Sequence, residues 1–437
     1  MVIFKVEKVI GDRLLSIESN KVARQADGAV TVRYGDTIIL ATVVAGVERE
    51  IDFFPLTVDY REKTYAAGKF PGGFFKREGK PTLKEILTMR LIDRPTRPLF
   101  PEGYKRDVQV MTSVLSADKE NDPDVLAMIG ASASLCISSI PFTKPVGSVR
   151  VGRLNGSLVL NPTHSELEQS DMDLVISGTE DGIIMVESAA REVSEDDMVQ
   201  AILFGQQAIK EIVRLQQELI HICGKEKEPI KGAPLPKELY DTIKAEAYDE
   251  IKSKSLTPGK QARSQALKVV LERLVEKYAS GDNPKTTDSQ VKAIFGKLEE
   301  EAIRDLIVKE RKRVDGRRPE DIRPISCEVG ILPRTHGSAL FTRGETQALV
   351  VATLGTALDE QRMDTLEEEY SKKFMLHYNF PPFCVGEVKP VYGPSRREIG
   401  HGNLAERALE AVIPPHQKFP YTIRVVSDIL ESNGSSS

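Results

Sequence analysis

Two adjacent arginines and a histidine lie close together in the segment Gly393-Pro-Ser-Arg-Arg-Glu-Ile-Gly-His-Gly402. Arg396 and Arg397 precede His401 by five and four residues, and the flanking glycines let backbone come close to a ligand. Guanidinium groups bind phosphate oxygens in a bidentate manner, which few other side chains can do. Two such groups beside an imidazole therefore predict a phosphate-rich substrate.

A second candidate site lies at Ser436 and Ser437, within the run Gly434-Ser-Ser-Ser437. Hydroxyl groups and backbone N–H groups in a turn before a helix can bind one small anion, and the helix dipole strengthens that binding. A serine-rich helix cap or an unstructured tail is the alternative that these residues leave open.

A third candidate is the segment Lys69-Phe-Pro-Gly-Gly-Phe-Phe-Lys-Arg-Glu-Gly79. It presents Phe74 and Phe75 next to Lys76 and Arg77, and single-stranded nucleic acid is bound by this chemistry, because bases stack on rings while cations contact phosphates. Residues 61–97 contain ten basic and four acidic residues in a chain whose net charge is −5. The alternative is that both phenylalanines belong to the core and the charges to a solvated face.

Asp171 and Asp173 form a weaker candidate, because paired carboxylates can hold Mg²⁺ but aspartates serve more often as caps and in turns. The sequence contains no Walker-type phosphate loop, no GxGxxG after a strand and no GxSxG elbow. These absences argue against the nucleotide-binding and hydrolase classes that carry such motifs.

Composition places the chain among well-cored globular proteins, with 40% hydrophobic and 29% charged residues in 437. Its four cysteines are widely separated, which predicts neither a zinc site nor a disulfide framework and favours a reducing cytoplasm. We expect no signal peptide and no membrane span, because no basic-apolar leader and no run of 18 apolar residues occurs.

The elements that must position these groups begin with a region of mainly β pattern, about the first 145 residues. Residues 37–44 and 108–115 are typical of strands. A capping box at Thr82-Leu-Lys-Glu85 predicts a helix to about Ile92 that Pro95 ends, and a helix of small residues is expected over 125–139.

Residues 146–190 return to a strand pattern, with hairpin turns at Asn155-Gly156 and Asp181-Gly182. A long amphipathic helix then runs from Ser194 to a C-cap near Gly224. From residue 225 to 318 Lys and Glu dominate and apolar residues recur at helical spacing. This region predicts a small all-helical unit, with a partly disordered charged linker as the alternative.

An internal repeat follows, because three landmarks recur in the same order at offsets of 309, 321 and 315 residues. The matched segments are Tyr34-Gly-Asp-Thr37 with Arg343-Gly-Glu-Thr346, Thr82-Leu-Lys-Glu85 with Asn403-Leu-Ala-Glu406, and Val108-Gln-Val-Met111 with Ile423-Arg-Val-Val426. The first copy continues for more than a hundred residues past its last landmark, whereas the second reaches Ser437 within a few. The second copy is therefore expected to be truncated, with part of its core unburied.

Together these segments resemble the bacterial polynucleotide phosphorylases over nearly the whole chain. The resemblance is carried by five strings: Asp52-Phe-Phe-Pro-Leu-Thr-Val-Asp-Tyr-Arg61, Gly72-Gly-Phe-Phe-Lys-Arg77, Arg90-Leu-Ile-Asp-Arg-Pro95, Gly393-Pro-Ser-Arg-Arg-Glu-Ile-Gly-His-Gly402 and Ser432-Asn-Gly-Ser-Ser-Ser437. It implies an α+β fold with two RNase PH-like domains (the β-α-β fold of ribosomal protein S5 domain 2) joined by an all-helical domain. The expected boundaries are 1–224, 225–318 and 319–437, the last being only the N-terminal part of its domain, and the family's KH and S1 RNA-binding domains are absent.

The resemblance also implies a nucleotidyltransferase that degrades single-stranded RNA from its 3′ end with inorganic phosphate, releases nucleoside diphosphates and can run in reverse. It further implies Mg²⁺, a homotrimeric ring with a central pore, a cytoplasmic location and a part in mRNA degradation and RNA processing.

Among the residues, the resemblance gives catalytic roles at the scissile phosphate to Arg396, Arg397 and His401. It assigns phosphate binding to Ser436 and Ser437, and RNA binding at the pore to Phe74, Phe75, Lys76 and Arg77. The metal-binding aspartates and the catalytic lysine would lie beyond residue 437, and Val175 stands where the first copy would need the lysine. This chain alone is therefore expected to have little activity, and a non-catalytic RNA-binding ring scaffold remains the alternative.

Overall fold

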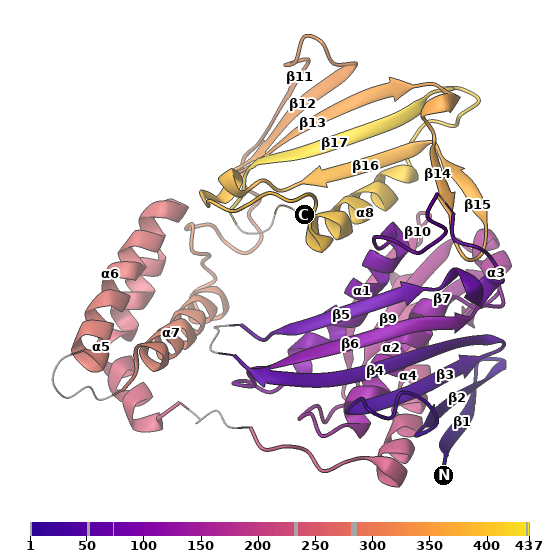
Figure 1. The fold of residues 1–437 in the computed structure, drawn as a ribbon. Helices are drawn as coiled ribbons and strands as arrows, with labels where there is room; N and C mark the ends of the chain where they lie inside the picture. Colours follow the sequence, from indigo (N-terminus) through magenta and orange to yellow (C-terminus); the bar gives the residue numbers. More distant parts are fainter. Residues whose placement is uncertain are drawn as a thin grey trace.

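The computed structural model describes residues 2–49, 53–72, 74–230, 235–280, 286–433 and 436. Figure 1 shows a first α/β unit, a group of three helices and a second, β-rich unit along the chain. The strands of the first unit are β1 (Phe4–Ile10), β2 (Arg13–Ser19), β3 (Gly28–Tyr34), β4 (Thr37–Glu48), β5 (Leu56–Glu62), β6 (Arg106–Ser116), β7 (Gly147–Leu154), β8 (Ser157–Leu160), β9 (Met172–Gly178) and β10 (Ile183–Ala190). Its helices are η1 (Thr64–Ala67), α1 (Leu83–Thr96), η2 (Arg97–Leu99), α2 (Pro123–Ile137), α3 (His164–Gln169) and α4 (Glu195–Cys223).

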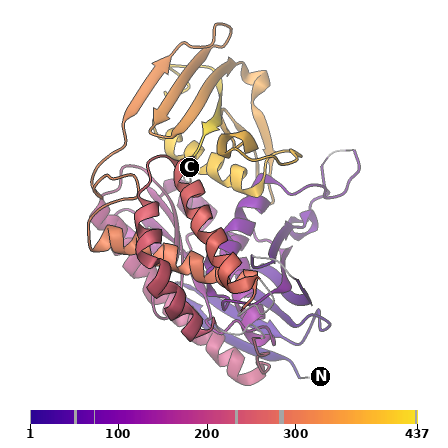
Figure 2. The same ribbon diagram turned by 90° about the vertical axis from the view of Figure 1, so that its left-hand side faces the viewer.

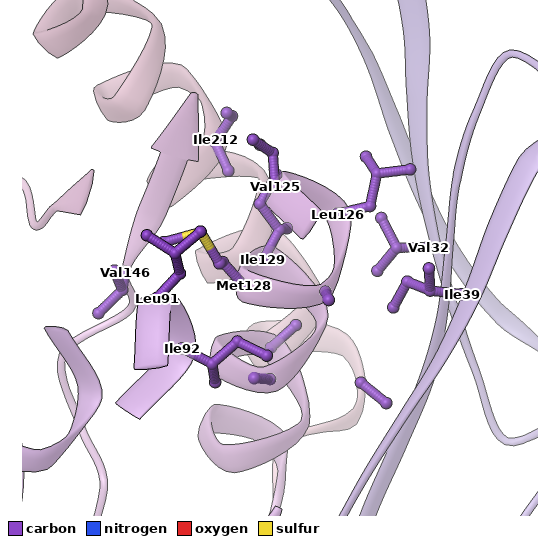
Figure 3. Close-up of a cluster of buried hydrophobic side chains, with 14 of the residues drawn as sticks. Val32, Ile39, Leu91, Ile92, Val125, Leu126, Met128, Ile129, Val146 and Ile212 are labelled. Carbon is purple, nitrogen blue, oxygen red and sulfur yellow. The ribbon is translucent and has the colours of Figure 1, made fainter. Parts of the chain in front are cut away.

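Two sheets enclose helix α2, with strand orders β1-β2-β3-β4-β6-β5 and β10-β9-β7-β8. Every residue of α2 is buried, which explains why this helix is built from small and apolar side chains. Figure 3 shows its residues Val125, Leu126 and Ile129 among side chains of the sheet and of neighbouring helices. Helix α2 lies so close to β4 that only glycine fits at residue 130 without a shift of its neighbours, because a Cβ there would lie 2.7 Å from Ile39 Cδ1.

The charged central region is helical and packed. It forms α5 (Lys237–Ser255), α6 (Lys260–Ala279) and α7 (Asp288–Val308), which lie against one another in Figure 2. Their shared core includes Ile243, Leu274 and Ile294, none of which is exposed. The prediction of an all-helical unit is therefore confirmed, and the alternative of a disordered linker is wrong for the described residues of this region.

The second unit repeats the first sheet. It contains β11 (Ile325–Val329), β12 (Gly337–Arg343), β13 (Thr346–Gly355), η3 (Ala357–Asp359), β14 (Gln361–Asp364), β15 (Glu369–Lys372), β16 (Phe374–Asn379), η4 (Pro382–Val385), α8 (Arg396–Glu410) and β17 (Thr422–Glu431). Its sheet order β11-β12-β13-β17-β16 matches the order β2-β3-β4-β6-β5 in the first unit. The last strand in each order, β16 or β5, runs parallel to its neighbour. The predicted duplication is confirmed.

The register of the repeated helix differs from the prediction. Helix α8 begins at Arg396 with Ser395 as its N-cap, so Asn403 lies inside the helix and is not its cap. Thr82 and Ser395 are the equivalent caps, at an offset of 313 residues. Pro95 likewise does not end α1 before it, because it lies within the last turn of that helix, where its missing N–H costs one backbone bond.

Helices α1 and α8, which are equivalent in the two copies, pack against each other between the two larger sheets (Figure 1). The turn between β14 and β15 also enters the first unit, where Leu366 joins the main hydrophobic core. Among the helices described, none is long and apolar enough to cross a bilayer.

Candidate functional site

The first turn of α8 carries both arginines of the predicted phosphate site. A capping box fixes this turn, because Ser395 caps the Glu398 N–H while Glu398 Oε2 accepts from the Ser395 N–H at 2.7 Å. The other oxygen of Glu398 accepts from the Phe380 N–H at 2.7 Å. The helix start is thus bonded to the end of β16, and the positions of Arg396 and Arg397 follow from it.

Arg397 and His401 lie one turn apart on the same face of α8. They line a small pocket of about 80 Å³ between the helix and the end of β16. The residues that line it are Tyr378, Phe380, Ser395, Arg397, Glu398, His401 and Ser436. The structure therefore brings together three of the predicted site residues, Arg397, His401 and Ser436.

The environment of His401 disfavours its charged form. Burial, and then the cations Arg397 and Arg90, lower the pKa of the His401 imidazole below its ordinary value. Its ring meets that of Tyr378 edge to face, with centroids 5.2 Å apart. His401 Nδ1 is buried and has no hydrogen-bond partner among the described residues. A neutral imidazole has one N–H donor and one acceptor nitrogen, so His401 could donate to or accept from a ligand in the pocket that it lines.

Arg90 is a cation of this site that the sequence did not reveal. It reaches α8 from α1 of the first copy and passes Gly400 so closely that a Cβ there would lie 2.1 Å from Arg90 Nε. Burial, and then Arg94 and Arg397, lower its pKa. Within the described part of the chain, its guanidinium makes no hydrogen bond or ion pair. Arg90 stood in a string that supported the resemblance, but only the packing of the two copies shows that it adjoins His401.

Arg396 points away from the pocket and contacts the first copy. Its guanidinium donates to the Val58 carbonyl oxygen at 2.5 Å and to Asp59 Oδ1 at 2.9 Å. Both acceptors lie on β5, the edge strand of the first sheet. Arg396 and Arg397 were predicted to act together on phosphate, whereas in the structure only Arg397 lines the pocket.

Ser436 lies at the pocket, where its Oγ is 2.6 Å from the Tyr378 hydroxyl oxygen. The second predicted phosphate ligand, Ser437, lies outside the described residues.

The aromatic and basic loop of the first copy is exposed. Phe74 and Phe75 are 93% and 87% exposed, and their rings meet edge to face at 5.6 Å. The alternative that they belong to the core is therefore wrong. Lys76 and Arg77 follow them as exposed cations. The loop presents two aromatic faces and two positive charges to solvent.

The aspartates of the first copy do not fit a metal ion. Asp171 pairs with Arg153 at 2.7 Å, and Asp173 pairs with Arg150 at 2.7 Å and with Arg407 at 3.6 Å. No cluster of three His, Cys, Asp or Glu side chains suited to a metal occurs among the described residues. Arginine partners already neutralise the carboxylates that the sequence offered as weak Mg²⁺ ligands.

Comparison with known families recovers the duplication and the helical unit. Domain 1 of the 3′ exoribonuclease family matches residues 11–141 and again residues 321–437, and domain 2 of that family matches residues 144–208. The RNA-binding domain of polyribonucleotide nucleotidyltransferase matches residues 238–318, which contain α6, α7 and all but the first residue of α5.

Polyribonucleotide nucleotidyltransferases from several bacteria are similar over almost the entire chain. That of Geotalea uraniireducens is 52% identical over 435 residues, which is 99% of this chain and 62% of the relative. That of Heliobacterium modesticaldum is 50% identical over 439 residues, covering 100% of this chain and 61% of the relative. The chain thus spans about three fifths of the length of these relatives.

Proposed function

Since the chain belongs to the 3′ exoribonuclease family and has the domain order of polyribonucleotide nucleotidyltransferases, we propose that it acts in phosphorolytic degradation of RNA from the 3′ end. In this reaction an oxygen of inorganic phosphate attacks the phosphorus of the last internucleotide bond. The bond from phosphorus to the 3′ oxygen breaks, a proton goes to that oxygen, and a nucleoside diphosphate leaves. The reverse reaction would extend RNA.

The observation that carries this proposal is the pocket in which Arg397 and His401 meet Ser436, with the guanidinium of Arg90 beside it. The nucleophile is phosphate itself, so the protein needs to position two phosphate groups and offset their charge rather than supply a covalent group. Arg397 and Arg90 would hold the scissile phosphate. Ser436 would contact the attacking phosphate, and neutral His401 would hydrogen-bond a phosphate oxygen or the departing 3′ oxygen.

Other parts of the proposal rest on the resemblance. The chain would supply part of the active site, while metal-binding aspartates and a lysine from a later part of the second copy would complete it. Mg²⁺ would neutralise charge on the reacting phosphates, with no ligand assigned within these residues. The homotrimeric ring and the cytoplasmic location belong to the same proposal, and the exposed Phe74 to Arg77 loop would guide the RNA strand.

Phosphate-dependent release of ADP from poly(A) with Mg²⁺ tests this function. We expect strong release from a full-length relative and little or none from the 437-residue chain, which should still bind poly(A). In the full-length protein, Arg397→Ala should lower kcat/KM at least about a hundredfold, because a charged donor to the reacting phosphate is lost.

Three outcomes would contradict the proposal. Binding of RNA without phosphorolysis by the full-length protein would favour the ring scaffold. Cleavage that persists without phosphate would indicate a hydrolase. Robust ADP release by the 437-residue chain alone would show that the active site is complete within it.

A further inference from the structure

The strand and the helix that line the Arg397 pocket both have counterparts in the first copy, which the strand registers and the helix caps identify. Tyr60 of β5 pairs with Thr112 of β6, as Tyr378 of β16 pairs with Ser427 of β17. The equivalent caps Thr82 and Ser395 then place Lys84 at the position of Arg397 and Thr88 at that of His401. The first copy thus has a second, equivalent place for an anion, with Lys84 as its cation.

That place is filled by a side chain from the other copy. Glu367, in the turn between β14 and β15, lies with Oε1 2.8 Å from Lys84 Nζ, in a side chain that is 12% exposed. The same oxygen is 3.7 Å from Nε2 of His164, a buried nitrogen with no hydrogen-bond partner among the described residues. A carboxylate therefore sits at the equivalent cation, where the Arg397 pocket would take a phosphate.

The hairpin that carries Glu367 is an addition peculiar to the second copy. In the first copy β4 ends at Glu48 and β5 begins at Leu56, whereas β13 ends at Gly355 and β16 begins only at Phe374. The extra residues form β14 and β15, which reach into the first unit in Figure 1. Leu366 anchors the turn in the core at 3% exposure, and Lys69 Nζ donates to the Thr365 carbonyl oxygen at 2.9 Å.

The charges around Lys84 show that it is held as a cation. Asp122 and Glu62 lie 3.5 and 3.6 Å from its Nζ. Burial opposes the charged form, but these carboxylates and Glu367 outweigh it and raise the pKa of Lys84. Burial likewise opposes ionisation of Glu367, yet Lys84 holds the pKa of that carboxyl below its ordinary value. Three carboxylates thus offset the buried charge of Lys84, and Glu367 makes the shortest contact of the three.

We propose that Glu367 is a built-in anion that occupies the first copy's counterpart of the Arg397 pocket, and that this counterpart accepts a small oxyanion, carboxylate or phosphate, once the Glu367 carboxylate is removed. The counterpart pocket of the first copy would then be unable to take a phosphate because the Glu367 side chain fills it, in addition to the residues that the first copy lacks. This inference concerns Lys84 and does not depend on the proposed RNA phosphorolysis.

Chemical rescue of Glu367→Ala tests the proposal. Thermal unfolding is followed in sodium acetate and in sodium chloride at equal ionic strength. The variant should unfold several degrees below the unmodified chain in chloride and recover at least half of that loss in acetate. The unmodified chain and Glu367→Gln should show no acetate-specific shift, because in both a side chain still fills the space. If Glu367→Ala does not fold in chloride, the yield of folded protein on refolding in the two salts gives the same comparison.

Two further variants make the result specific. Glu368→Ala, which removes the neighbouring exposed carboxylate, should behave like the unmodified chain. Lys84→Met added to Glu367→Ala should abolish the recovery. Inorganic phosphate is the second probe. Stabilisation by phosphate that Glu367→Ala shows and the Lys84→Met/Glu367→Ala double variant lacks reports binding at Lys84, because the Arg397 pocket is the same in both. Equal responses of Glu367→Ala to acetate and to chloride would reduce Glu367 to an ordinary ion pair and overturn the proposal.

Discussion

Arg396 and Arg397 are neighbours in sequence but belong to different contacts. Successive residues of an α-helix point about 100° apart, so one side chain can face the pocket while the other faces β5 of the first copy. Arg397 joins His401, and Arg396 joins Asp59 and the Val58 carbonyl. The doublet therefore combines a residue that lines the pocket with one that bonds to the first copy.

The contact between Arg396 and Asp59 can be tested by a double-mutant cycle. If Arg396 acts through β5, then Asp59→Asn and Arg396→Ala should each lower kcat/KM of the full-length protein for poly(A), and the double variant should be no worse than the more severe single one. If Arg396 instead leaves Asp59 to bind RNA, removing the carboxylate should tighten RNA binding. Two results together would exclude both roles of the Arg396–Asp59 contact. The KM for RNA would be the same in Asp59→Asn and in the unmodified protein, and the losses in kcat/KM of the two single variants would add in the double variant.

Residue types alone singled out three residues that the structure brings to one pocket, but not the geometry of that pocket. Arg397, His401 and Ser436 were candidates because guanidinium, imidazole and hydroxyl groups suit phosphate. Arg90 was not, because it lies about 300 residues before His401 and only tertiary packing brings them together. The separation of Arg396 from Arg397 was equally hidden, because it depends on where the edge strand of the other copy lies.

At the scale of elements, the packing of α8 on α1 and on β16 depends on two glycines of α8. Gly402 faces β16, where a Cβ would lie 3.3 Å from the Tyr378 backbone nitrogen, and Gly400 faces the Arg90 side chain. Glycine weakens a helix interior by about 1 kcal/mol relative to alanine. The close approach of α8 to its two neighbours therefore outweighs the helix propensity that these positions give up.

Gly400→Ala should separate these two effects. The new methyl group would lie 2.1 Å from Arg90 Nε, so Arg90 must leave its position, and we expect a loss of about 1–2 kcal/mol in the free energy of unfolding. With Arg90→Ala already present, the same substitution should stabilise the protein by up to about 1 kcal/mol, because only helix propensity remains. Urea unfolding of the four proteins measures both values, and a destabilising Gly400→Ala in the Arg90→Ala background would contradict this account.

The elements themselves were largely predictable, and the wrong start of α8 has a physical cause. Strands, hairpins and the long helix α4 follow from periodicity and turn residues, and they occur where expected. The repeated helix was given the wrong start because Asn403-Leu-Ala-Glu406 has the pattern of a capping box, as does Ser395-Arg-Arg-Glu398. The bond from the Phe380 N–H to Glu398 favours the earlier start, and it depends on the tertiary position of the end of β16, which the local sequence does not show.

At the scale of the whole molecule, two similar sheets face each other across α1 and α8, and the contacts between the copies join them at several points. Arg396 bonds to β5, and the turn at Leu366 and Glu367 enters the first unit. The helical unit is joined to the second copy by Lys260, whose Nζ donates to the Ser432 carbonyl oxygen at 2.9 Å. Cations from both copies meet at one pocket because of this arrangement.

The exposed Phe74 and Phe75 permit a test of whether RNA uses more of the molecule than this pocket. Replacing both with alanine should leave the unfolding midpoint unchanged, because 93% and 87% of these residues are already exposed. Binding of a 20-nucleotide single-stranded RNA should weaken at least about fivefold, because base stacking on an aromatic ring contributes about 1–3 kcal/mol. An abasic strand of the same length should bind both proteins equally, since it has phosphates but no bases to stack.

Leu358→Ala, which removes a 97% exposed apolar side chain from the second copy, serves as the control. Fluorescence anisotropy gives the affinities, and an equal loss for the abasic strand would show that the loop acts through its charge and not through its rings.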